Sequence, residues 1–456
     1  MHNRDNKEIK MKTGFSRICI NPPLGVPMVG YYEERRVKGI HDDIFASALA
    51  LDDGERRALI VTVEVCLLST EQCNFFRESI ANAAKIDKKG VFLNCSHTHT
   101  GPTIGDDKIS GLDGNDEYDE AFLKCLCKVS TDAFANMCES SFSYAEGKAE
   151  GISFVRRYRM KDGSVRTNPG VGNPDILEVL GTPNETVKAV RIDRADGEHY
   201  VLVNYGLHAD CVGGEYISGD WPGVVRDTVE KVLYDTKCIF ILGSQGDVNH
   251  INVSPTNGER RGLAYDTFDG VPRGFEHALH VGRRIAGEAI GIYGKAEPFT
   301  ADKLSFASKL ISIPSNRENS KLEEARRIKK LYETGRTDEL PYTDMELTTV
   351  VAEAVRICEL ENGPESFEFV LSALRIGELT LAGMPGECFT EIGRRIEKDY
   401  KRKHILVCCL TNGGDSYFPT SKAYDEGGYE ARTSRLKKGG DDIIVNGISA
   451  LTEGLE

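Results

Sequence analysis

Residues 91–102 read VFLNCSHTHTGP, an apolar run that passes directly into two histidines. The run from Val91 to Asn94 is typical of a buried strand. His97 and His99 lie two residues apart, so they point to the same side if the strand geometry persists into the loop. The stretch predicts an α/β protein with a polar site just beyond the end of a strand.

Four further apolar runs pass into polar clusters in the same way. They are 201–205 before His208, 238–242 before Gly246-Asp247-Val248-Asn249-His250, 379–381 before Pro385-Gly386-Glu387, and 405–407 before a loop that contains Tyr417. In open α/β sheets, ligands bind beyond the carboxyl ends of the strands. Two of these loops offer imidazoles and a third offers a carboxylate, which is a zinc-type ligand set.

Composition sets the class of protein. The chain has 456 residues, of which 40% are hydrophobic and 28% charged, and its formal net charge is −14. The acidic balance argues against binding to a nucleic acid backbone or to an anionic membrane surface. No run approaches the roughly 20 apolar residues of a membrane span. We therefore expect a cytoplasmic protein without stable membrane insertion that acts on a small molecule; the oligomeric state stays open.

The thirteen cysteines do not indicate a disulfide framework, because their number is odd and the expected compartment is reducing. Many of them lie in apolar runs, where a cysteine behaves as a small buried hydrophobe.

Strand-like and helix-like patterns alternate along the chain. We expect one catalytic domain over residues 12–456, with a mixed sheet, flanking helices and the metal site at strand ends. Residues 1–11 are expected to form a flexible segment. Residues 301–365 could form an inserted layer, because a strand there precedes two helices, one of them heavily charged.

Each candidate residue also has a structural interpretation. Glu387 opens an amphipathic helix, whose positive end favours an ionised carboxylate, so it could stabilise only its own helix. Tyr417 could be a packing residue. Asp247 could orient a histidine or stabilise a turn, and Arg156 could bind an anionic group or lie on the surface.

Several of these motifs resemble those of one known family. The loop Asn94–Pro102 is similar to the signature loop of the neutral and alkaline non-lysosomal ceramidases, which are zinc amidohydrolases. The likeness extends to the segment after Gly39-Ile40-His41, to His208 with Ile217-Ser218-Gly219-Asp220, to Pro385-Gly386-Glu387 with Gly393-Arg394-Arg395, and to Leu410-Thr411-Asn412 through Tyr417 and Tyr429-Glu430.

The resemblance implies a set of roles. His97, His208, Glu387 and Tyr417 would bind Zn²⁺. His99, Arg156 and Tyr429 would approach the bond that is cleaved, and His41 would line the same cavity.

Three departures limit the resemblance. The family has a serine where this chain has Asn249, and an amide cannot replace a hydroxyl in proton transfer or attack. His250, the next residue, could shuttle a proton, because imidazole titrates near neutrality. The family's C-terminal β-sandwich and secretion signal are not expected here, which argues against ceramide as the natural substrate.

The sequence thus predicts a zinc-dependent hydrolase that cleaves an amide or related C–N bond of a small soluble substrate. One alternative keeps the metal but runs a lyase, isomerase or glycoside-cleaving reaction on a sugar-like substrate. The other alternative is a non-catalytic binding protein that kept the fold.

Overall fold

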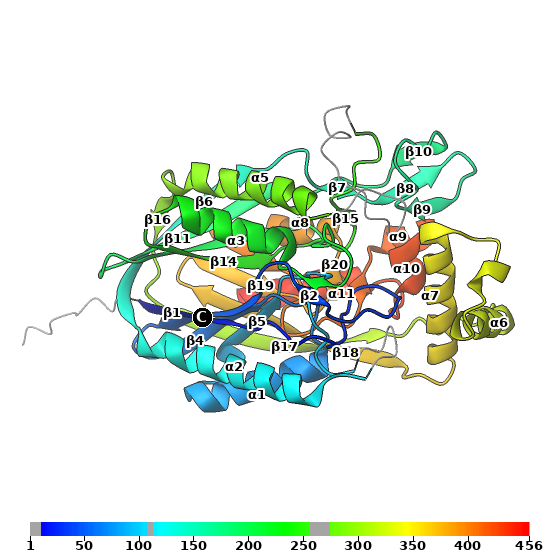
Figure 1. Ribbon diagram of the computed structural model, residues 1–456. Coiled ribbons are helices and arrows are strands. Elements are labelled where there is room, and N and C mark those ends of the chain that lie inside the picture. The colour runs from blue at the N-terminus through cyan, green and yellow to red at the C-terminus, as the bar shows by residue number, and fades with distance from the viewer. Residues whose placement is uncertain (1–10, 107–112, 256–273, 456) are drawn as a thin grey trace, which may run out of the picture.

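The largest β-sheet of the described residues, with nine strands, forms the centre of the molecule (Figure 1). The computed structural model describes residues 11–106, 113–255 and 274–455. Within these residues the larger sheet has the spatial order β14 (Thr236–Leu242), β12 (His199–Tyr205), β11 (Thr186–Arg194), β6 (Cys138–Lys148), β1 (Lys12–Cys19), β3 (Phe45–Asp52), β4 (Arg57–Val63) and β5 (Val91–Cys95), with β16 (Glu297–Phe299) paired to β6. The expected mixed sheet is confirmed, since the outermost pairs, β12–β14 and β4–β5, are parallel and the pairs between them are antiparallel.

A second sheet packs against the first. It contains β17 (Leu304–Pro314), β18 (Ser366–Ile376), β19 (Leu379–Gly383) and β21 (His404–Cys408), and its last pair, β19–β21, is parallel. Short strands complete the described chain: β2 (Gly39–Ile40) with β13 (Tyr216–Ile217), β7 (Phe154–Val155) with β15 (Val248–Asn249), β20 (Glu387–Cys388) with β22 (Tyr417–Phe418), and the set β8 (Arg157–Met160), β9 (Val165–Thr167) and β10 (Ile176–Val179).

Helices cover the outer faces of the two sheets. On the larger sheet, α1 (Thr70–Ala84) and α2 (Asp116–Ala135) contact the half that contains β1, β3 and β5, while α3 (Asp220–Val232) and α5 (Phe275–Tyr293) contact the half that contains β6, β11 and β14. On the smaller sheet lie α8 (Thr390–Asp399) and α11 (Gly440–Glu453). The remaining helices, α6 (Leu322–Glu333), α7 (Asp344–Leu360), α9 (Ser421–Glu426) and α10 (Tyr429–Thr433), gather at one end of the molecule (Figure 1).

The core explains why the strands read as continuous apolar runs. In β4, Leu59 and Val61 face the helices, and Ile60 faces the second sheet together with Leu381 and Leu406. Both faces of the strand are therefore buried, which removes the alternation of polar and apolar residues. The result is a sandwich of two sheets between two helical layers.

The parallel pairs bring the predicted site loops to one place. The loops that carry His97, His208 and Glu387 follow β5, β12 and β19, and each of these strands belongs to a parallel pair. Parallel neighbours end at the same edge of a sheet, so the three loops leave from carboxyl ends of two sheets that are packed face to face.

Buried asparagines join the two sheets at this edge. The amide nitrogen of Asn94 in β5 donates to the carbonyl oxygen of Cys409 at 2.7 Å and to Thr411 Oγ1 at 3.0 Å, and its oxygen accepts from the backbone of Leu242. Asn204 in β12 donates to the carbonyl oxygens of Ile241 and Val407. A buried amide needs such partners, so these contacts fix how the strand ends face each other.

The segment 301–365 supplies β17 to the second sheet and the helices α6 and α7, which pack on each other through a small apolar cluster of their own. Its description as an inserted layer stays a prediction. Helix α1 begins with a reciprocal capping box between Ser69 and Gln72. Nowhere in the described ranges does a helix combine the length and apolar character needed to cross a bilayer.

Candidate metal centre

Three side chains from different loops converge beyond the strand ends. Oε2 of Glu387 lies 3.2 Å from Nε2 of His97 and 3.1 Å from Nε2 of His208. All three residues are buried, and their candidate ligand atoms lie within 4.8 Å of one another. Two imidazoles and one carboxylate are the protein ligands of many catalytic zinc sites.

Backbone carbonyl groups orient both imidazoles. Nδ1 of His97 lies 2.9 Å from the carbonyl oxygen of Cys66, and Nδ1 of His208 lies 3.0 Å from that of Gln245. A carbonyl oxygen only accepts hydrogen bonds, so each contact uses Nδ1 as a donor and leaves Nε2, which faces Glu387, as the nitrogen that can bind a metal. Histidine ligands of metals are held in this way in proteins. The residues present therefore fit a divalent cation.

The local backbone at His97 is strained. Its φ of +71° lies in the left-handed region, which a histidine seldom adopts, while its N–H donates to the carbonyl oxygen of Val65 at 3.0 Å. Strand β4 ends at Val63, and the residues that follow it lie along the histidine loop, where the carbonyl oxygens of Val63 and Val65 accept from the N–H groups of Ser96 and His97.

Tyr417 completes the cluster from the opposite strand. It pairs with Glu387 across the short parallel pair β20–β22, so the two side chains leave the backbone side by side. Its hydroxyl lies 3.3 Å from Nε2 of His208 and accepts a hydrogen bond from Nη2 of Arg156 at 3.2 Å. Arg156 is itself buried and forms a 2.6 Å ion pair with Glu430, which is fully buried.

His99 and Tyr429 lie next to these residues. Nε2 of His99 is 3.3 Å from Nε2 of His97. The rings of Tyr429 and Tyr417 have centroids 5.8 Å apart, and the hydroxyl of Tyr429 lies 3.1 Å from that of Tyr32. The structure thus gathers His97, His99, His208, Glu387, Tyr417, Arg156 and Tyr429 into one cluster.

Charge is divided unequally among the groups of this cluster. Burial opposes ionisation of Glu387, but His97 and His208 outweigh it and hold the pKa of the carboxyl well below its usual value. Burial also opposes a charge on His97, yet the carboxylate of Glu387 keeps its pKa well above normal. The pKa of His208 is lowered by burial and then by Arg156, and that of His99 by burial and then by His97. The cluster thus presents an ionised carboxylate, a His97 imidazole that favours its protonated form, and two imidazoles, those of His99 and His208, that favour the neutral form.

Other candidates have contacts outside this cluster. The amide of Asn249 donates to Asn168 Oδ1 at 3.0 Å, and Nδ1 of His250 lies 3.1 Å from Asp210 Oδ1. His41 is largely exposed, and its ring packs on Phe275. Asp247 accepts hydrogen bonds from the backbone and hydroxyl of Thr390, so it stabilises the start of α8 rather than a histidine.

Several residues of the site carried no assigned role in the sequence. Gln245 donates from Nε2 to Glu387 Oε2 at 3.2 Å, and it lies in a loop after β14 that showed the same strand-to-polar pattern. Glu430 was visible only as a neighbour of Tyr429. Tyr32 follows no strand-like run, so no pattern pointed to it.

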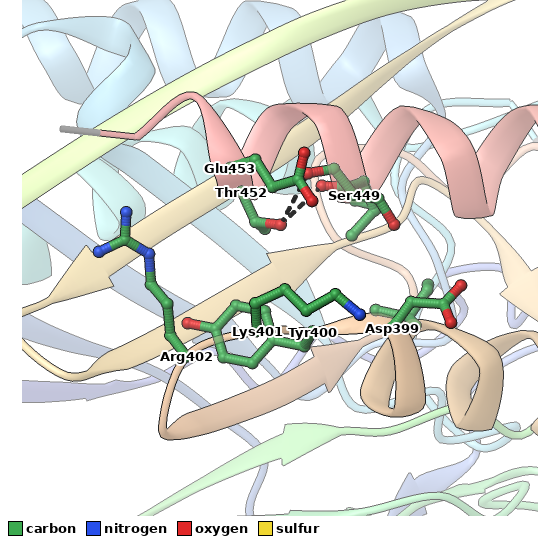
Figure 2. A pocket seen from close by; sticks show the side chains of 9 residues that line it. Asp399, Tyr400, Lys401, Arg402, Ser449, Thr452 and Glu453 are labelled. Atoms are coloured by element: carbon green, nitrogen blue, oxygen red, sulfur yellow. Dashed lines mark hydrogen bonds between the residues drawn. The ribbon is translucent and has the colours of Figure 1, made fainter.

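A surface hollow between the end of α8 and α11 lies apart from this centre (Figure 2). It has a volume of about 170 Å³, and Asp399, Lys401, Arg402 and Glu453 around it carry both signs of charge. The hydroxyl of Tyr400 in its wall donates to Thr380 near the start of β19, whereas Glu387 follows the other end of that strand. The hollow is therefore at the opposite edge of the second sheet.

Fold and cluster together define an α/β protein with a buried cluster of candidate metal ligands at the ends of its strands. Two solved structures share this fold. Neutral ceramidase from Pseudomonas aeruginosa superposes with a TM-score of 0.71 at 18% sequence identity, over 98% of this chain and 75% of that one. A ceramidase complexed with C2 gives a TM-score of 0.71 at 17% identity, over 98% of this chain and 76% of that one. No family model matches the sequence. The chain therefore has the neutral ceramidase fold, as the resemblance predicted.

Proposed function

We propose that this chain is a divergent relative of the neutral ceramidases, a zinc-dependent hydrolase that cleaves an amide or related C–N bond of a small soluble substrate. The proposal is carried by one observation: His97, His208 and Glu387 converge from three strand ends, and their imidazoles are already oriented toward a common centre.

The ligand set suits zinc best among common divalent cations, because imidazole and carboxylate are preferred zinc ligands. Bound there, the ion would supply an acidified water molecule and polarise a carbonyl oxygen. Glu387 offsets the charge of the cation. Tyr417 offers a further oxygen ligand beside His208.

The surrounding groups suit the developing charge of amide hydrolysis. The Arg156 guanidinium is held by Glu430 and by the carbonyl oxygen of Gly246, so it is rigid before substrate arrives. Tyr429, whose hydroxyl is paired only weakly at 3.1 Å to another phenol, can donate to an oxyanion. His99 is neutral and can donate to, or accept from, the leaving group. A positioned donor of this kind lowers the activation free energy by about 2.7–4 kcal/mol.

Asn249 makes a serine-dependent route unsuitable for this chain, because its amide is already bound to Asn168 and cannot transfer a proton. The substrate we favour is small and polar. A hollow of about 220 Å³ beside Thr167 and Asn168 includes the charged residues Arg166, Asp344 and Glu346. Thr167 also accepts from the backbone N–H of Tyr429, which places the hollow next to the cluster.

The test combines metal analysis with a panel of N-acyl amides that runs from N-acetyl compounds to ceramide. We expect one zinc in the cluster and hydrolysis of short polar amides that a chelator abolishes. His208→Ala should remove that zinc and the turnover. His199→Ala is the matched control, because His199 begins the same strand that ends before His208.

Products separate the proposal from its alternatives. Hydrolysis releases amine and carboxylate in equal amounts, with oxygen from labelled water in the carboxylate. A product formed without water would favour a lyase or isomerase. A zinc-loaded protein that turns over no amide in the panel, or a His208→Ala variant that keeps full turnover, would contradict the proposal.

A further inference from the structure

A second cluster of metal-ligating side chains lies outside the centre described above. Cys211, His250 and His277 have candidate ligand atoms within 4.8 Å of one another, and Cys211 and His250 are buried. Bonds of about 2.0–2.3 Å to a tetrahedral zinc set ligand atoms roughly 3.3–3.6 Å apart, so small side-chain shifts close the site.

Three separate segments build this cluster. Cys211 follows β12 and comes three residues after His208, and His250 comes directly after β15. His277 lies in the first turn of α5. The N–H of Gly274, just before that helix, donates to the carbonyl oxygen of Cys211 at 2.5 Å, which fixes the start of α5 beside the thiol.

One nitrogen of each imidazole is bound to an oxygen that can only accept. Nδ1 of His250 lies 3.1 Å from Oδ1 of Asp210, and Nε2 of His277 lies 3.4 Å from the carbonyl oxygen of His250. These contacts place the lone pairs on Nε2 of His250 and on Nδ1 of His277. A carboxylate behind a metal-bound histidine is a recurrent arrangement in zinc proteins.

We propose that Cys211, His250 and His277 bind a second zinc ion, with Asp210 orienting His250. One thiolate and two imidazoles form a ligand set that selects zinc over magnesium or calcium, and they leave a fourth position for water. The same short segment thus serves both ions, with His208 at one and Cys211 at the other. The second ion joins the loop after β12, the loop after β15 and the start of α5.

Cobalt substitution tests the site directly, since a thiolate bound to Co²⁺ gives an intense near-ultraviolet charge-transfer band. We expect the wild-type protein to hold two zinc ions per chain and to show this band after exchange with cobalt. Cys211→Ser should lose the band and one metal ion. His277→Gln should lose or weaken the band although the thiol of Cys211 is intact. This second variant tests the site if Cys211→Ser does not fold.

The control is Cys66→Ser. Cys66 is the thiol near the first centre, with its Sγ 3.6 Å from Nδ1 of His97. The band should survive this change, and it should also survive His208→Ala. One metal ion per folded wild-type chain, no thiolate band, or a band lost in Cys66→Ser but kept in Cys211→Ser would each overturn the proposal. A band that depends on Cys211 in a protein without amidase activity would support the second site and contradict the proposed function.

Discussion

The ring of Tyr417 lies nearly parallel to that of His208, at an interplanar angle of 9°, with its hydroxyl 3.3 Å from Nε2 of the histidine. The hydroxyl of Tyr417 therefore lies close to the position toward which Nε2 of His208 is directed. Its burial, followed by the nearby Glu387, raises the pKa of Tyr417 well above normal, so only a strong cation such as a bound metal or Arg156 would favour its anion.

Tyr417→Phe should leave the three stronger ligands in place and weaken zinc binding by about 10–100-fold, the usual cost of losing a supporting contact. Competition with a chromogenic chelator measures the affinity. Tyr424→Phe is the control, since its hydroxyl bonds Ser434 outside the cluster. Equal affinities in wild type and Tyr417→Phe would show that the phenol is not a ligand.

Tyr429→Phe should separate chemistry from metal binding. The hydroxyl contacts Tyr32 rather than a candidate ligand, so zinc content should not change, while kcat should fall about 10²–10³-fold if the phenol donates to an oxyanion. Steady-state kinetics on the best amide of the panel, with metal analysis of the same sample, checks this. A normal kcat would remove Tyr429 from the mechanism.

Arg156→Leu should destabilise the protein strongly, because it removes the 2.6 Å ion pair of the fully buried Glu430 carboxylate and leaves that charge only Thr167 and the more distant Arg157, at 4.0 Å. Breaking a buried pair from one side costs about 3–5 kcal/mol. Arg327→Ala, which breaks an exposed pair with Glu324, should leave the free energy of unfolding almost unchanged. Urea unfolding measures both. Similar free energies of unfolding for the two variants would mean that Glu430 finds other partners or protonates.

Asn94→Leu should loosen the edge where the sheets meet. It removes two hydrogen bonds to the end of the second sheet and one to Leu242, and it leaves the buried N–H of Leu242 without this acceptor. Each unsatisfied group costs about 1–3 kcal/mol. Asn82→Leu, the same change at an exposed position of α1, is the control in thermal unfolding. An unchanged midpoint for Asn94→Leu would contradict this account.

The stability of the protein should fall as pH rises from about 4 to 6, in part because of Asp220. Burial raises the pKa of this carboxyl from 3.8 to about 6, despite two backbone N–H donors. The folded state therefore holds the proton more tightly, so the favourable contribution is complete below pH 3.8 and is lost as pH passes 6. The free energy of unfolding loses about 3 kcal/mol from this group between the two ends of that pH range.

Asp220→Asn cannot titrate and should flatten this part of the profile, whatever its effect on absolute stability. Urea midpoints between pH 4 and 7 measure the slope. The same slope in wild type and variant would show that other groups account for it.

Much of the centre could be predicted because its ligands follow apolar runs directly. A histidine or glutamate after a buried strand is conspicuous, and the structure brings His97, His208, Glu387 and Tyr417 together. The packing of two sheets face to face could not be predicted from the sequence. Strands buried on both faces carry no alternation, so the sequence does not reveal that Ile60 meets a second sheet. Contacts between distant loops, such as Tyr32 with Tyr429 or Asn94 with Cys409, leave no periodic signal at all.

The pair α6–α7 has its own apolar cluster, so it can open without exposing the interior of the sandwich. Tyr332 in α6 donates to the carbonyl oxygen of Tyr32, while Glu346 and Glu353 in α7 bind Arg432 in the short helix that Tyr429 begins. Opening of this pair would withdraw support from both phenols at the rim of the centre. Amide hydrogen exchange in 322–360 would then report how often Tyr429 and Tyr32 lose this support, including openings that occur only once in minutes to hours.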